Sequence, residues 1–174
     1  MTEVGAFGAV HPLARRLLEA IPGAPLAQQI DLAKLMHSEA PAVAAEVALQ
    51  LLERLDGRAS VSVMMMCAEM LRVHGDPGML LRLRAVRGRL PTFPGLRDWR
   101  ADVDRAIAVI DTRQTDRCRC DAESEGVPDR EVFALAVIAR EPCLITMRAV
   151  CRTCAREFVV VEEEGYHFPL FRWT

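Results

Sequence analysis

The sequence predicts an α+β protein in which an all-α amino-terminal domain of helical hairpins precedes a small antiparallel β module. The pattern of apolar residues changes near residue 115. Before that point, apolar residues recur at the three- and four-residue spacing of amphipathic helices. After it come β-branched runs, turn residues and five of the six cysteines. We therefore expect a helical domain over residues 10–113 and a β module over residues 115–174.

Six helices are predicted in the first domain. Pro22-Gly23 ends the first helix, and Asp56-Gly57 ends the third. The fourth carries apolar residues on nearly all of its faces, which predicts a place at the centre of a bundle or beneath a partner. Asp76-Pro77 supplies a cap and a first-turn proline for the fifth. The expected segments are about residues 12–21, 25–38, 41–55, 59–74, 76–90 and 96–111.

The predicted helices fall into pairs that begin near residues 11, 41 and 76, at spacings of 30 and 35 residues. Regular helical hairpins of this length predict a stacked α-solenoid. In the third pair, the first helix ends at Leu90-Pro91, and the second helix contains the run LRDWRADVDRAIAVID. It resembles a HEAT-type repeat, and the resemblance covers residues 41–113. A HEAT-like stack would offer a concave binding face, and an irregular helical bundle is the alternative.

Short β-branched and aromatic runs predict antiparallel strands in the second domain. The first three are expected over residues 131–139, 143–150 and 157–163, with a turn at Arg140-Glu141-Pro142 between the first two. A last apolar run covers residues 166–173. Because Pro169 lacks a backbone N–H group, this run is expected at an edge of the sheet.

Four cysteines form two close pairs, Cys118-Arg-Cys120 and Cys151-Arg-Thr-Cys154, which are 30 residues apart. Two pairs of thiolates on tight turns supply the tetrahedral ligand set that zinc prefers. The 30 residues between the pairs suffice for a hairpin that brings them together. The arrangement resembles a zinc ribbon over residues 117 to about 165, which implies a structural Zn²⁺ on which the strands pack. It departs from the ribbon pattern in having CxC in place of one CxxC.

Three other interpretations of these cysteines are open. They could be reduced, metal-free core residues, or Cys151 and Cys154 could form a redox disulfide. A catalytic zinc is the third, with His167 and one of Glu162–Glu164 beside the metal, although four thiolates would close its coordination shell. Cys143, at the start of a predicted strand, is expected in the core. Cys143 or His167 would replace any of the four cysteines that does not bind.

Composition narrows the class of partner and the compartment. The net charge of −2 points to neither nucleic acid nor a membrane, and 51% of the residues are hydrophobic, which is enough for a core. The most apolar stretches, Val61–Met66 and Phe133–Ala139, are far shorter than a membrane span. The amino terminus lacks the pattern of a secretory signal. We expect a cytoplasmic protein, in which closely spaced cysteines are metal ligands before they are disulfides.

Two groups of side chains are candidates for interaction. The arginines of the fifth predicted helix either bind phosphate or form ion pairs with Asp98, Asp102 and Asp104. The aromatic residues near the carboxyl terminus either close the core of the β module or form an exposed recognition patch. The first group is Arg82, Arg84, Arg87 and Arg89, and the second is Tyr166, Phe168, Phe171 and Trp173.

The sequence contains no nucleotide-binding glycine loop, no serine-centred elbow and no HExxH motif, and it has four histidines. We therefore predict a non-catalytic protein-binding adaptor or regulatory protein with a structural zinc, such as a small bacterial immunity partner. One alternative is a nucleic-acid-binding accessory protein that uses the zinc ribbon and the helix arginines. The other is a metalloenzyme with zinc near His167.

Overall fold

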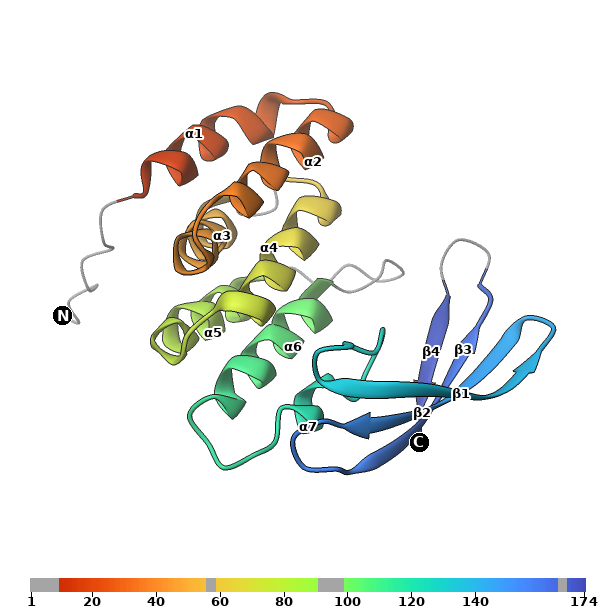
Figure 1. Cartoon of the computed structure of the whole chain (residues 1–174). Coiled ribbons are helices and arrows are strands. Elements are labelled where there is room, and N and C mark those ends of the chain that lie inside the picture. The colour runs from red at the N-terminus through yellow and green to blue at the C-terminus, as the bar shows by residue number, and fades with distance from the viewer. Residues whose placement is uncertain (1–9, 56–58, 91–98, 166–168) are drawn as a thin grey trace. The chain divides into compact units, whose positions relative to one another are not determined.

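The computed structural model describes residues 10–55, 59–90, 99–165 and 169–174, and it divides the chain into two compact units, Met1–Asp111 and Thr112–Thr174 (Figure 1). The first unit is helical. Among the described residues, the second contains one short helix and a four-stranded antiparallel sheet. The predicted class, α+β with helices before a small sheet, is confirmed.

The helices of the first unit occupy the segments that the apolar periodicity predicts. Two of those segments begin or end as 3₁₀ helix: η2 (Leu35–Ser38) continues α2, and η3 (Pro77–Met79) precedes α5. The start predicted near residue 96 for the last helix lies outside the described residues. The α-helices are α1 (Pro12–Ala20), α2 (Leu26–Lys34), α3 (Pro41–Leu55), α4 (Val61–His74), α5 (Leu80–Arg89) and α6 (Trp99–Thr112), and η1 (Ile21–Gly23) follows α1.

Local capping explains where several of these helices begin. The backbone N–H of Leu13 donates to the His11 ring, and Pro12 occupies the first turn of α1. The Ser60 hydroxyl accepts from Val63 N–H at the start of α4. The Asp76 carboxylate accepts from Gly78 N–H at 2.7 Å at the start of η3. These contacts satisfy backbone donors that have no partner within the helix.

Successive helical pairs lie side by side in the first unit. Helix α1 packs on α3, α3 packs on α5, and α2 packs on α4, as Figure 1 shows. Helix α4 contributes Met64, Cys67 and Met70 to the buried core, so its apolar surface lies inside the unit as expected. At the end of α4, Gly75 lies so close to α6 that an added Cβ would stand 2.6 Å from Ile110 Cδ1.

The sheet of the second unit has the strand order β1-β2-β3-β4. Its strands are β1 (Phe133–Glu141), β2 (Leu144–Cys151), β3 (Glu157–Glu163) and β4 (Leu170–Trp173). A register shift between Val137 and Ala139 marks a bulge in β1. Strand β4 follows Pro169 and lies at the edge of the sheet, as predicted.

The turn between β1 and β2 corrects one expectation from the sequence. Strand β1 continues through Glu141, and Pro142-Cys143 form a two-residue turn in which Cys143 has φ 64°. Proline suits the first central position of a turn whose second central residue has positive φ. Cys143 is therefore exposed in the turn and is not a core residue at a strand start.

One face of the sheet carries the core of the second unit. Phe133 is fully buried and meets Phe158 and Trp173 at ring-centroid distances of 5.6 and 5.0 Å. The Trp173 indole N–H donates to the carbonyl of Gly126 at 2.8 Å, which ties the carboxyl-terminal strand to the loop that precedes β1. Val132, Met147, Ala149 and Val160 complete this small core together with Cys120 and Cys151.

Among the described residues, no helix has the length and apolar character needed to cross a membrane.

Candidate metal centre

The first cysteine pair lies where the chain turns into the short helix α7 (Cys120–Glu123). Cys118 precedes the helix, and its carbonyl accepts from Asp121 N–H at 3.0 Å. Cys120 is the first helical residue and is fully buried. A one-residue gap therefore allows both cysteines to bind the same metal ion, because the helical turn begins between them.

The second pair lies in the tight turn between β2 and β3. Cys151 ends β2, and its N–H donates to the Arg156 carbonyl at 2.8 Å. Ala155 closes the turn with φ 59°, and its N–H donates to the Cys151 carbonyl at 3.0 Å. The Thr153 N–H donates to Cys151 Sγ at 3.4 Å. The sheet and this turn together fix both sulfurs of the pair.

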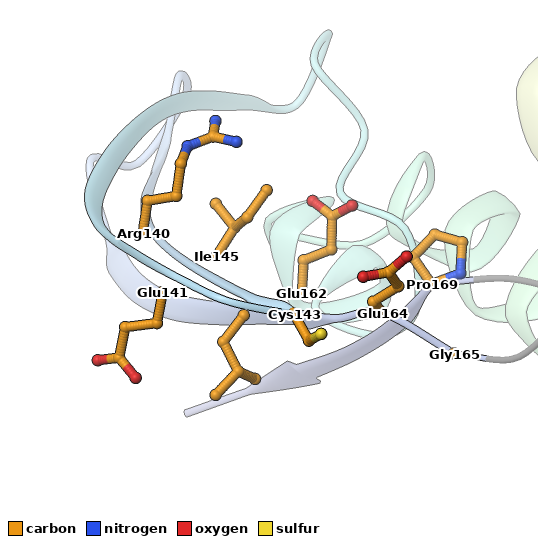
Figure 2. Close-up of a pocket in the computed structure, with 9 residues that line it drawn as sticks. Arg140, Glu141, Cys143, Ile145, Glu162, Glu164, Gly165 and Pro169 are labelled. Atoms are coloured by element: carbon orange, nitrogen blue, oxygen red, sulfur yellow. The ribbon is translucent and has the colours of Figure 1, made fainter.

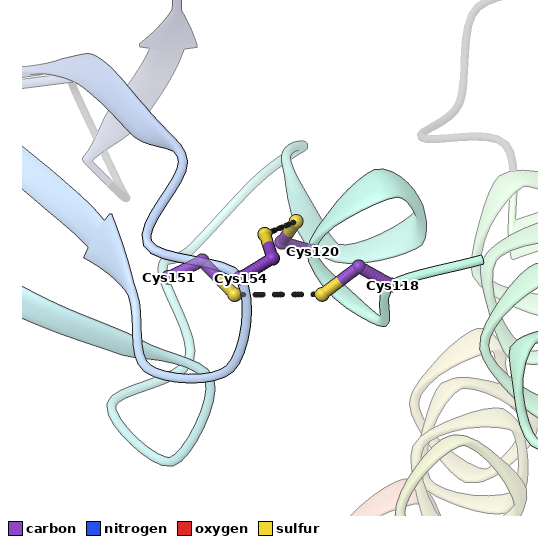
Figure 3. Close-up of side chains that lie close together, drawn as sticks. All are labelled: Cys118, Cys120, Cys151 and Cys154. Carbon is purple, nitrogen blue, oxygen red and sulfur yellow. Dashed lines mark hydrogen bonds between the residues drawn. The ribbon is translucent and has the colours of Figure 1, made fainter. Parts of the chain in front are cut away.

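The structure brings the two pairs together (Figure 3). Cys118 Sγ lies 3.5 Å from Cys151 Sγ, and Cys120 Sγ lies 3.5 Å from Cys154 Sγ. All four sulfur atoms lie within 4.8 Å of one another, and all four cysteines are free thiols. A tetrahedral zinc with Zn–S bonds of about 2.3 Å would separate its sulfurs by about 3.8 Å. The observed cluster therefore has the dimensions of a four-thiolate metal site.

Burial and hydrogen bonding shift the pKa values of the cluster thiols in different directions. Burial raises the pKa of Cys120 above its ordinary value. Burial also acts to raise the pKa of Cys151, but hydrogen bonds from the Cys154 and Thr153 N–H groups and from the Cys118 and Cys154 thiols outweigh it, and the pKa falls to about 7. Cys118 is half-buried and Cys154 is exposed. One thiol of the cluster is thus set up to ionise near neutral pH, as a metal ligand must.

A charged network surrounds the first pair. The Arg119 guanidinium contacts the fully buried Glu123 carboxylate and, at 3.0 Å, the Asp129 carboxylate. Arg156, from the second turn, forms an ion pair with Asp121 of α7. These contacts join α7 to the loop before β1 and to the cysteine turn. These contacts were not predicted from the sequence, although the four-residue spacing of Arg119 and Glu123 is a usable signal on a helix.

Cys143 does not join the cluster. It precedes β2, whereas Cys151 ends that strand, so the length of the strand separates them. The Cys143 thiol instead contacts the Glu164 carboxylate, which raises its pKa. His167, the other reserve ligand, lies outside the described residues.

The arginines of α5 make ion pairs within the helical unit. Arg82 contacts Glu46 and Glu53 of α3, Arg84 contacts Asp111 at 3.1 Å, and Arg87 contacts Asp104 at 2.7 Å. Ion pairs of these arginines with Asp104 were one of the two predicted alternatives, whereas Asp111 and the two glutamates on α3 were not predicted. Arg89 is exposed and has no carboxylate partner among the described residues.

Two of the four carboxyl-terminal aromatic residues lie in β4. Phe171 and Trp173 are half-buried and pack against the core of the sheet unit. Their contacts favour the expectation that they close the core of the module. Tyr166 and Phe168 lie outside the described residues.

Together, these observations define the site as a cluster of four thiols that could hold one metal ion. The chain matches no protein-family model, no curated protein and no solved structure.

Proposed function

We propose that Cys118, Cys120, Cys151 and Cys154 bind one structural Zn²⁺, and that the protein is a non-catalytic protein-binding adaptor or regulatory partner. The clustering of the four sulfur atoms within 4.8 Å carries the metal assignment. Thiolates are soft ligands that suit zinc, and four of them leave no coordination position for a substrate. A metal ion in a closed site of this kind stabilises the module and has no position at which a substrate could bind.

The size of the sheet unit supports a structural role. Among the described residues, its buried apolar core consists of a few side chains from α7, from β1–β3 and from Val132, and it includes two of the proposed ligands. Modules this small gain much of their stability from a metal or a disulfide. A metal bound to both pairs would join α7 to the turn between β2 and β3, so the metal would stabilise the sheet's connections directly.

The adaptor assignment draws on the helical unit. Stacked helical pairs present extended surfaces that suit protein partners. The ion pairs of Arg82, Arg84 and Arg87 favour a protein partner over a nucleic acid, because carboxylates within the unit already engage three of the four arginines of α5. An immunity-type or regulatory role in the cytoplasm is the concrete form of this proposal.

The structural role of the metal is tested with Cys120→Ser and Cys151→Ser, with Cys143→Ser as the matched control. We expect both ligand variants to lose zinc and the amide-exchange protection of β1–β3, while the helical unit keeps its protection. Cys143→Ser should retain about one zinc per chain. Ligand variants that keep the protection of the sheet but lose an enzymatic activity would instead support the metalloenzyme alternative.

The choice of partner is tested by affinity capture from the native host, with and without nuclease treatment. The adaptor proposal predicts a protein that is recovered in stoichiometric amount after nuclease treatment. A fluorescence-anisotropy titration with RNA and DNA at two salt concentrations provides the opposing test. Sub-micromolar binding that weakens steeply with salt would contradict the adaptor proposal and support the nucleic-acid alternative.

A further inference from the structure

A pocket of about 430 Å³ lies at the end of the sheet unit where β1 turns into β2. Its lining includes Arg140, Ile145 and Glu162 from three adjacent strands, with Glu164 and Pro169 beyond β3. Cys143 contributes from the turn. The metal cluster involves the opposite end of β2, so the pocket is separate from the cysteine site.

Three of these side chains form a row across the sheet. Arg140 is the register partner of Ile145, and Ile145 is the register partner of Glu162. Figure 2 shows the three side chains on the same side of the sheet, with Ile145 between the two charged residues. Adjacent strands are about 4.8 Å apart, so the backbones that carry Arg140 and Glu162 are separated by about 10 Å. The row therefore has a cationic wall, an apolar floor and an anionic wall.

The two charged walls do not neutralise each other. Neither Arg140 nor Glu162 has an ion-pair partner among the residues that the structure describes, and Ile145 lies between them. The neighbouring Glu163, which points to the other face of β3, is paired with Arg172. Glu164 adds a second carboxylate on the anionic side. Opposite charges held apart above an apolar floor are complementary to a dipolar ligand with an aliphatic middle.

We propose that this pocket binds a basic α-amino acid, either free or as the carboxyl-terminal residue of a protein. The Arg140 guanidinium donates to the ligand's α-carboxylate, for which its planar fork is suited. The Glu162 carboxylate accepts from the cationic end of the ligand's side chain, and the negative charge of Glu164 reinforces this preference. The methylene groups between the two ends cover Ile145. This proposal goes beyond the adaptor function and does not depend on which metal the cysteines bind.

The test is an NMR titration of the full-length, metal-loaded protein with free L-arginine and with the peptide Ala-Ala-Arg. Norleucine, which keeps the α-ammonium group but lacks the side-chain cation, and the amidated peptide Ala-Ala-Arg-NH₂, which lacks the carboxylate, are the matched ligands. We expect arginine at about 10 mM to shift the backbone amides around Ile145 and Cys143. The two modified ligands should bind about tenfold more weakly or worse, because each lacks one charge-assisted contact.

Two variants test the walls, and each has a control on the opposite face of the sheet. Arg140→Gln is compared with Arg148→Gln, and Glu162→Gln is compared with Glu157→Gln. The proposal predicts that the pocket variants weaken binding about tenfold and that the controls leave it unchanged. Tighter binding of the peptide than of free arginine would assign the site to a protein carboxyl terminus, and the reverse would assign it to the free amino acid.

The proposal is overturned if neither arginine ligand shifts these amides at about 20 mM, a concentration at which weak millimolar binding is visible. It is also overturned if the amidated peptide or norleucine binds as well as the charged parent, or if the pocket variants and their controls behave alike. Because the titration uses the metal-loaded protein, a bound metal other than zinc or failure to capture a partner would leave these outcomes unaffected, so the two proposals fail separately.

Discussion

Arg82 on α5 donates two parallel hydrogen bonds of 2.8 Å to Glu53 on α3, from Nε to Oε1 and from Nη2 to Oε2. Its Nη1 atom also donates to both carboxylate oxygens of Glu46 at 2.9 Å. The pKa of Arg82 is raised, mainly because of its hydrogen bonding to Glu53. The Glu53 side chain is only 5% exposed, whereas the Arg82 side chain is 36% exposed, so this contact joins two helices through a carboxylate that is largely shielded from water.

We predict that Arg82→Ala lowers the free energy of unfolding by about 2 kcal/mol, because it leaves the Glu53 carboxylate buried without its guanidinium. The control is Arg84→Ala, whose ion pair with Asp111 is more exposed and should contribute about 0.5 kcal/mol or less. Urea denaturation followed by circular dichroism measures both. Equal effects of the two substitutions would show that the Arg82 network contributes no more than a surface pair.

Two glycines of the helical unit should respond oppositely to alanine. Gly75→Ala places a Cβ 2.6 Å from both Ile110 Cδ1 and the Leu71 carbonyl oxygen, so we predict a loss of about 1–3 kcal/mol in unfolding free energy. Gly88 lies within α5 with open space around its Cα, so Gly88→Ala should gain about 0.5–1 kcal/mol. Thermal unfolding monitored at 222 nm distinguishes them. A stabilising Gly75→Ala would contradict the close contact between α4 and α6.

Ala155 closes the second cysteine turn in the left-handed region at φ 59°, where a side chain is strained. We predict that Ala155→Gly stabilises the metal-loaded sheet unit by about 0.5–1 kcal/mol, since glycine relieves that strain but increases the entropy of the unfolded chain. Ala149→Gly is the contrasting substitution: it lies within β2, is fully buried, and should destabilise the unit. Denaturant-dependent hydrogen exchange of the β2 and β3 amides measures both effects. A destabilising Ala155→Gly would mean that the turn does not hold this backbone conformation in solution.

Cys143 should be the first cysteine to be alkylated in the metal-loaded protein, because it is exposed and is not part of the cluster. Its contact with Glu164 raises the pKa of the thiol, so the thiolate forms, and iodoacetamide reacts, at higher pH than for an ordinary cysteine. Glu164→Gln should shift the pH–rate profile toward lower pH. Peptide mass spectrometry over a pH series measures the rates. Faster alkylation of Cys154 than of Cys143 would contradict ligation of Cys154.

Local signals made most of the helical unit predictable. Asp76-Pro77 and Pro41 occupy the positions of a cap and a first turn that their chemistry favours, and the apolar surface of α4 lies in the core. The HEAT-like arrangement of the pairs stays a prediction. The partners of Arg82 could not be predicted, because Glu46 and Glu53 meet it only through the packing of α3 on α5.

The cysteine cluster was predictable for a different reason. Two pairs separated by a hairpin must return to each other once β1 and β2 are antiparallel, so spacing and topology agree. Cys143 was misplaced because Pro142 occupies the first central position of the turn and puts the cysteine in the second. The pocket row of Arg140, Ile145 and Glu162 depends on the register of three strands, and that register follows from the turn and the bulge in β1.

The measurement that most directly tests the central claim is elemental analysis of the purified, reduced, full-length protein, together with the Cys120→Ser variant. We predict about one zinc per chain in the native protein and a large loss in the variant, because three thiolates and a serine make a much weaker site. The sheet should also lose its amide protection when a chelator removes the zinc. Native protein that is folded, reduced and free of metal, or that contains iron instead, would contradict the account.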